Sequence, residues 1–287
     1  MSRQFDRRYN LTIIPPEGNA RRIEELELSF DIKKTLYGYP NLGTLKILNP
    51  NLDTINTLRR KYTRIILNLG YGDDLRLAFR GDVRNVTQTK TSTKREITIY
   101  AGDGARDFNN STFNKTFEAG IPTQEIAREV IGTFRSLVAG DISGVPMVAD
   151  HPDGLSLSGQ SSKILDDLAR QYEADWSIQD GVVNVLQADR TLGGQEAIVI
   201  NSGSGMIGSP TVTERGANVT TLLNTQIVPG ALFSIKAVGS EVSLGNLFFR
   251  TENVRTNASG FYKAVTVDLK GNSRRGDWYS SIEGIRI

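Results

Sequence analysis

Three kinds of residue pattern in this sequence could support chemistry, and the sharpest is Gly203-Ser204-Gly205-Met206-Ile207-Gly208. It matches the G-x-G-x-x-G pattern of turns that bring the backbone against a pyrophosphate at the start of a helix. Here Pro210 and the β-prone Thr211-Val212-Thr213 follow, so no helix is expected. No Asp or Glu lies between Glu214 and Glu241 to hold a ribose. The motif therefore predicts a glycine turn and no cofactor.

The second pattern is the single histidine, in Asp150-His151-Pro152-Asp153, which resembles a fragment of a metal site. One imidazole with nearby carboxylates could bind a hard cation weakly, whereas zinc sites use several imidazole or thiolate ligands. The chain has one His and no Cys, so it supplies no further ligand of these kinds. The same scarcity disfavours a Ser-His-Asp triad. We predict a surface-loop histidine and no metal site.

The third pattern is the carboxylate pairs Asp73-Asp74 and Asp166-Asp167. A glycosidase needs two carboxyl groups facing each other across a bond, roughly 5–9.5 Å apart. Adjacent residues in a turn or on the wet face of a helix do not provide this, although a pair distant in sequence could. Arg80-Gly81-Asp82 and Arg275-Gly276-Asp277 spell an integrin tripeptide, which we interpret as coincidence. We therefore predict no catalytic, cofactor-binding or metal-binding residue, and no enzyme.

Composition narrows the class of protein further. No apolar run approaches the ~20 residues of a membrane span, so no membrane insertion is expected, and the charged N-terminus is not a secretory signal. The absence of cysteine excludes disulfides and suits a reducing cytosol. Residues 1–100 carry 18 Lys and Arg against 11 Asp and Glu, including Lys33-Lys34 and Arg59-Arg60-Lys61. Because these basic groups fall on different predicted elements, we expect a solvated surface. A face for nucleic acid or an acidic partner is the alternative.

The elements that must position these residues begin with a β-rich first hundred residues. Leu26, Leu28, Phe30 and Ile32 alternate with polar residues, which indicates a strand with one dry face. Further strands are predicted at residues 45–48, 64–69, 75–86 and 95–101, with a short helix at 52–61. Five or six strands in this length suggest a barrel or a sandwich.

The middle of the chain mixes helix and strand. Residues 155–186 are typical of a strand, a helix capped by Ser161 or Ser162, and a hairpin with a type I′ turn at Asp180-Gly181. A second amphipathic helix opens at Pro122-Thr123. Beyond residue 201, strands are expected at 232–238, 247–255 and 261–269, and these predict a second barrel-like domain.

The order of these features resembles the baseplate hub proteins of tailed bacteriophages, which join the tail tube to the central spike. The matching residues span about 79–279, and each piece is weak alone, so their order carries the resemblance. They are Phe79-Arg80-Gly81, residues 97–103, Leu157-Ser158-Gly159, Leu165-Asp166-Asp167-Leu168-Ala169, Trp176-Ser177-Ile178-Gln179-Asp180-Gly181, Gly205-Met206-Ile207-Gly208-Ser209-Pro210, Glu214-Arg215-Gly216, Leu222-Leu223-Asn224, Pro229-Gly230, Phe261-Tyr262 and Asp277-Trp278-Tyr279. The family usually has a Gly-Asp turn after the late strand, whereas this sequence has Gly271-Asn272. This departure concerns the role of the last loop and does not affect the expected fold.

The resemblance implies a mainly β fold with an α+β middle. Two tail-tube-like β-barrel domains, residues 1–104 and 201–287, would flank a small helix-on-sheet domain of residues 105–200, and strands from the middle region can complete the second barrel. It further implies a structural homotrimer that adapts a sixfold tail tube to a threefold spike and encloses the channel for the genome.

The partners implied are the tail-tube protein, the central spike protein, other baseplate proteins and, as a further option, the tape-measure protein. DNA would pass through without specific binding, because many phosphate contacts would trap it. The protein would be made in the host bacterial cytoplasm and reside in the virion tail baseplate. The alternatives are a tail-associated enzyme acting on cell wall or polysaccharide and a β-rich module that binds nucleic acid through residues 1–100.

Overall fold

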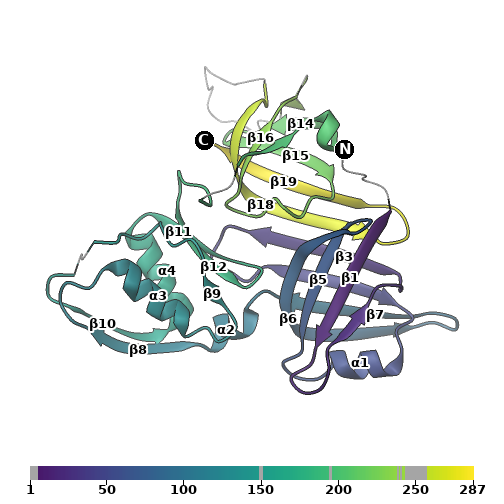
Figure 1. Ribbon diagram of the computed structural model, residues 1–287, viewed down its shortest axis with the longest axis horizontal. Helices are drawn as coiled ribbons and strands as arrows, with labels where there is room; N and C mark the ends of the chain where they lie inside the picture. The colour runs from purple at the N-terminus through teal and green to yellow at the C-terminus, as the bar shows by residue number, and fades with distance from the viewer. Residues whose placement is uncertain (1–5, 149–150, 194–195, 238, 240, 243–256) are drawn as a thin grey trace, which may run out of the picture.

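The computed structural model describes residues 6–148, 151–193, 196–237, 239, 241–242 and 257–287. It is mostly β and has two parts (Figure 1). We call the large, mostly antiparallel part the sheet body and the smaller part, formed by residues 105–187, the lobe. Among the described residues, no helix is both long and apolar enough to cross a membrane.

The sheet body is one continuous sheet that contains strands from both ends of the chain. Fourteen of the described strands belong to it, and twelve form the path β17-β14-β15-β19-β18-β3-β4-β7-β6-β5-β1-β2, with β13 and β16 paired beside β18. Its elements are β1 (Arg7–Ile14), β2 (Arg21–Ile23), β3 (Leu28–Thr35), β4 (Leu42–Leu48), α1 (Leu52–Leu58), β5 (Arg64–Tyr71), β6 (Asp74–Lys90), β7 (Arg95–Gly102), β13 (Ile198–Ile200), η1 (Ser202–Ser204), β14 (Met206–Val212), β15 (Gly216–Leu222), β16 (Leu232–Ile235), β17 (Glu241–Val242), β18 (Gly260–Asn272) and β19 (Trp278–Arg286).

The strands predicted in the first hundred residues and at 261–269 are confirmed with extended bounds, except that the first of them begins at Leu28 and leaves Leu26 outside it. Four long strands, β1, β14, β15 and β19, were not predicted from the alternation of residues. In β15 and β19 the inward positions include the polar Thr221 and Ser280, which interrupt the apolar period. In β1 the inward Tyr9, Leu11 and Ile13 are apolar, so the alternation is present in the sequence. The strand predicted at 247–255 lies outside the described residues.

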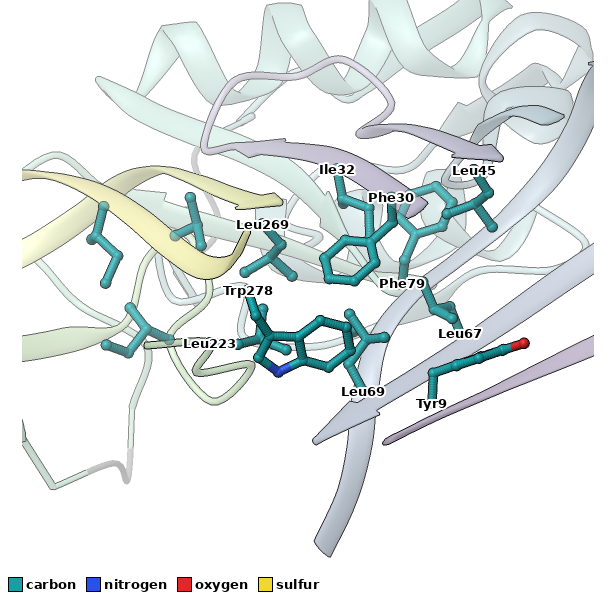
Figure 2. Packing of buried hydrophobic residues seen from close by; sticks show 14 of the residues in the cluster. Tyr9, Phe30, Ile32, Leu45, Leu67, Leu69, Phe79, Leu223, Leu269 and Trp278 are labelled. Atoms are coloured by element: carbon teal, nitrogen blue, oxygen red, sulfur yellow. The ribbon is translucent and has the colours of Figure 1, made fainter. Parts of the chain in front are cut away.

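One hydrophobic core runs through the sheet body. It combines residues from the first hundred positions with residues from 200 to 282. The two groups meet where β3 pairs with β18 over seven residue pairs, from Thr35 opposite Thr266 to Ser29 opposite Asn272, and we call this pairing the seam. Beneath the seam, the rings of Phe30 and Trp278 pack edge to face with centroids 5.2 Å apart (Figure 2).

The lobe has a second core of its own. It is built from α2 (Ala105–Asn110), β8 (Thr112–Phe117), α3 (Thr123–Gly132), β9 (Val138–Ala139), β10 (Leu155–Gln160), α4 (Ser161–Gln171), β11 (Ala174–Gln179) and β12 (Val182–Gln187). Helices α3 and α4 bury the predicted apolar stripes, as in Figure 1, where both lie over the strands of the lobe.

Two local predictions in the lobe have different outcomes. The β11–β12 turn is confirmed, because Asp180 and Gly181 both have positive φ, 53° and 90°, as a type I′ turn requires. The predicted serine cap of α4 is wrong. Ser161 and Ser162 lie inside the helix and are buried; Ser162 Oγ donates to the carbonyl of Phe108, and the N-cap position falls on Gln160.

Candidate functional site

The residues singled out for chemistry do not gather at one place. Residues 203–208 run from η1 into β14, so a strand follows the glycines as predicted, and Gly205 and Gly208 have positive φ. The chain thus lacks at this point the helix N-terminus that a pyrophosphate would use. His151 is half-buried, and its carbonyl accepts hydrogen bonds from the backbone N–H groups of Gly120 and Gly154. Asp150, beside it, lies outside the described residues.

The carboxylate pairs are also separate. Asp73 and Asp74 lie exposed at the turn between β5 and β6 in the sheet body, whereas Asp166 and Asp167 lie on α4 in the lobe. Asp166 forms an ion pair with Arg170 at 2.8 Å. In the part of the chain that the structure describes, no three His, Asp or Glu side chains are grouped so that they could hold a metal ion.

The two Arg-Gly-Asp tripeptides have structural surroundings. In the first, Arg80 donates to the carbonyl of Ser136 in the lobe, and Asp82 accepts the backbone N–H of Arg106. Gly81 is buried, and a Cβ there would lie 2.7 Å from the ring of Phe79. The second tripeptide forms the β18–β19 turn, where Arg275 pairs with Glu27 at 3.5 Å.

The outer face of the sheet body is a further candidate surface, and we call it the polar face. Residues that are paired on neighbouring antiparallel strands point to the same side of the sheet. Following these pairs from strand to strand therefore gives rows of neighbouring side chains that cross β15, β19, β18, β3, β4 and β7. One row contains Thr220, Ser281, Asp268, Lys33 and Leu42. The next row contains Leu222, Tyr279, Lys270, Asp31, Thr44 and Tyr100.

Charges of opposite sign are interleaved on the polar face at the seam. Asp268 lies opposite Lys33, and in the adjacent row Lys270 lies opposite Asp31. Burial raises the pKa of the Asp268 carboxyl; Lys33 lowers it, and Asp31 and Glu283 raise it. Because the signs alternate across strands that come from opposite ends of the chain, the polar face presents no extended field of one sign here.

The lobe contacts the sheet body through the tip of the β11–β12 hairpin, at a set of contacts that we call the lobe joint. Lys34, 1% exposed, places its Nζ 2.5 Å from Oδ2 of Asp180. Asn41 Nδ2 donates to the carbonyl of Ile178 at 2.6 Å and to Oε1 of Gln179 at 2.9 Å. Gln179 Nε2 in turn donates to the carbonyl of Thr35 at 2.8 Å. Side chains from three segments of the chain therefore form one buried polar network.

A second carboxyl group, that of Asp103, is buried beside this pair. Burial raises its pKa to about 8 and the Asp180 carboxylate raises it too, whereas Lys34 and the nearby backbone N–H groups of Asp180 and Gly181 lower it. Neither carboxylate oxygen of Asp103 meets hydrogen-bond geometry with a described group. Perturbed carboxyls often mark active sites. This one is 1% exposed and enclosed by the hairpin, so we assign it to the lobe joint.

The prediction that the basic pairs lie on a solvated surface fails at Lys34. The signal was present in the sequence, because Lys34 has the same parity along β3 as Leu28, Phe30 and Ile32 and therefore points inward. No comparable signal marks Asp103, which follows the end of β7.

Comparison with known proteins finds similarity in structure only. No protein-family model matches the chain, and no curated protein matches it by sequence. The tail protein from Neisseria meningitidis MC58 is similar over 97% of this chain and 96% of its own length, with a TM-score of 0.63 and 9% identity. The 43 kDa tail protein of prophage MuSo2 from Shewanella oneidensis is similar over 97% of this chain and 98% of its own length, with a TM-score of 0.62 and 10% identity.

A third similar structure is the E. coli c3393 protein, a component of the type VI secretion system described as structurally similar to the T4 bacteriophage tail proteins gp27 and gp5. Here the similarity covers 91% of this chain and 73% of the other, with a TM-score of 0.57 and 8% identity. At such identities the likeness concerns the fold. The mainly β chain described here has the fold of phage tail proteins, in agreement with the resemblance drawn from its sequence.

Proposed function

We propose that this chain is a structural hub of a phage or phage-like tail. The observation that carries the proposal is the similarity to two phage tail proteins along nearly the whole length of all three chains. A match of this extent includes the joined sheet and the lobe together. An isolated β-barrel, a very common shape, would give much weaker support.

The proposed assembly is a homotrimer that adapts a sixfold tail tube to a threefold spike. Residues 1–104 and 201–287 would supply two tube-like barrels per chain, with residues 105–200 between them. Strands from both of these ranges lie in the sheet body and meet edge to edge at the seam. Three copies related by cyclic symmetry would then present six similar units, each chain contacting its neighbours through two different surfaces.

We further propose that the polar face lines the channel of this ring. DNA bound through many Lys and Arg contacts is held strongly. A wall that must let DNA pass needs few uncompensated cations. The interleaving of Lys33 and Lys270 with Asp268 and Asp31 is suited to that requirement. DNA would then move along the channel without specific binding.

The proposed partners are the tail-tube protein, the central spike protein and other baseplate proteins, with the tape-measure protein as a further option. The c3393 protein supports a spike partner, because it is described as similar to both gp27 and gp5. The proposed location is the tail baseplate of the virion, after synthesis in the host bacterial cytoplasm. We propose no enzymatic activity, since the carboxylate pairs lie in separate parts of the fold.

The test is the solution mass of the purified chain, measured by light scattering over a concentration series. A stable species of about 95 kDa, three times the 31.6 kDa of one chain, is expected. A dimer at every concentration would contradict the proposal, because twofold symmetry cannot match a threefold spike. A strict monomer would shift support to the alternative of a tail-associated enzyme. Hydrolysis of purified peptidoglycan that one carboxylate substitution abolishes would establish that alternative.

A further inference from the structure

A groove of about 540 Å³ lies where the end of α1, the middle of β6 and α2 come together. We call it the basic groove. Five cationic side chains line it, and Asp82 is the one carboxylate among its lining residues. The cations are Arg59, Arg60, Lys61, Arg84 and Arg106. The sequence shows Arg59-Arg60-Lys61 as an isolated basic run, and the fold adds two arginines from other elements to it.

Acidic groups in the described part of the chain compensate the five cations only weakly, through the electrostatic interaction of Asp82 with Arg106. None of them forms an ion pair with a described carboxylate, although other surface arginines do, for example Arg21 with Asp53 at 3.2 Å. Arg59 and Arg60 donate single, long hydrogen bonds of 3.3 Å to neutral oxygens of Gln88 and Glu17. Like charges gathered in one groove repel one another, and a bound anion relieves that repulsion.

The polar groups of the groove suit a peptide better than a phosphodiester chain. Asn109 and Asn110 donate through Nδ2 to carbonyls of their own helix, at 2.6 and 2.7 Å. Their amide oxygens remain as acceptors in the groove. A peptide backbone supplies N–H donors for such acceptors at every residue except proline, whereas phosphate groups supply only acceptors.

The apolar and aromatic residues that line the basic groove also favour a peptide over a nucleic acid. Leu58, Val83 and Val86 add apolar surface to the groove, which can receive the aliphatic part of a peptide. Sequence-independent binding of single-stranded nucleic acid relies on aromatic rings that are free to stack with bases. The aromatic ring here, that of Tyr62, already has the guanidinium of Arg106 3.9 Å from its centroid.

We propose that the basic groove docks an acidic segment of a protein partner, a short stretch in which Asp or Glu residues are interspersed with apolar ones. Guanidinium groups bind carboxylates through two parallel hydrogen bonds, so several arginines in one groove would select a carboxylate-rich segment. The proposal does not require the trimer or the channel, and its test can fail while the mass measurement above succeeds.

The test uses a labelled ten-residue peptide of Glu and Leu and measures its binding to the full chain by fluorescence anisotropy. The groove variant carries Arg59→Glu and Arg84→Glu, both at exposed positions. The matched control carries Arg128→Glu and Lys163→Glu, exposed on α3 and α4, which change the net charge equally. We expect saturable binding that the groove variant weakens by about 10-fold or more and the control by less than about 2-fold.

Three outcomes would overturn the proposal. One is the absence of saturable binding, and another is an equal loss in the groove variant and the control, which would indicate attraction by net charge alone. The third is tighter binding of a labelled ten-nucleotide oligo-dT, which would make the groove a nucleic-acid site. Circular dichroism of both variants verifies that the fold is unchanged. A Gln-for-Glu version of the peptide should bind at least about 10-fold more weakly.

Discussion

The seam and the lobe joint both connect parts of the chain that are far apart in sequence, but they use different physical means. At the seam, β3 and β18 exchange backbone hydrogen bonds over seven residue pairs, above aromatic packing between Phe30 and Trp278. At the lobe joint, the contacts described above are made by a few polar side chains, chiefly the buried Lys34 and the partly buried Asp180. Substituting an outward side chain leaves the backbone hydrogen bonds of a sheet in place and should cost little stability. Removing one partner of a buried ion pair leaves an uncompensated charge and is strongly destabilising.

Two adjacent residues express this difference. Lys33 points to the polar face of β3 and is exposed, while Lys34 points the other way and is buried against the hairpin. A single strand thus contributes one lysine to each connection. If the connections differ as we infer, substitutions at these neighbours should have very different effects, and the predictions below run from the largest effect to the smallest.

The largest effect is expected from Lys34→Met. The substitution leaves the buried carboxyl groups of Asp180 and Asp103 without their cation, and breaking a buried pair in this way typically destabilises a protein by about 3–5 kcal/mol. The matched control is Lys33→Met, an exposed change expected to alter stability by less than about 1 kcal/mol. Urea unfolding followed by circular dichroism measures both. Similar losses at the two positions would remove the distinction between the connections.

The second effect concerns pH and Asp103. Its carboxyl has a pKa of about 8 in the folded chain against a usual value of 3.8, so between these values the folded chain holds a proton that the unfolded chain has lost. The stability contributed by this group is therefore fully present below about pH 4 and declines as the pH rises to about 8. Asp103→Asn should remove the decline, so that relative to wild type its free energy of unfolding is about 2–3 kcal/mol more favourable at pH 7 than at pH 5.

Urea unfolding at a series of pH values checks this prediction. Asp167→Asn, an exposed change on α4, controls for the loss of one negative charge. If the pH dependence of wild type and of Asp103→Asn ran in parallel, the buried carboxyl would have no part in it, and the lobe joint would be no more sensitive to pH than the seam.

The sequence predicts the individual strand and turn that take part in these connections. It does not predict which distant segment each of them contacts. The alternation of Leu28, Phe30 and Ile32 predicts β3 and, by parity, the inward position of Lys34. The Asp180-Gly181 turn is equally local, because positive φ at both positions follows from the residue types. Each of these predictions needs only a few neighbouring residues.

The long-range pairings could not be predicted in this way. Strand β3 meets β18 across more than two hundred residues, and no periodicity within either strand selects the other as its partner. The strands β15 and β19 also escape detection, since inward Thr221 and Ser280 break the apolar pattern. For the same reason the basic groove is invisible in the sequence, because Arg84 and Arg106 approach Arg59 only in the folded chain.

The smallest effect is expected at the seam itself, from a double-mutant cycle on Lys33 and Asp268. These residues are opposite each other in register but are not within ion-pair distance, and Lys33 is exposed. The coupling free energy should be about 0.2–1 kcal/mol and should fall towards zero in 1 M salt, where the screening length is about 3 Å. The same cycle on Lys34 and Asp180 should give a larger coupling that salt barely changes, because water and ions are excluded from the pair. A large, salt-resistant coupling at Lys33 and Asp268 would mean that the polar face holds the two halves of the sheet together. Backbone pairing alone would then be insufficient, and the alternating charges would have a structural task besides the proposed neutral lining of a channel.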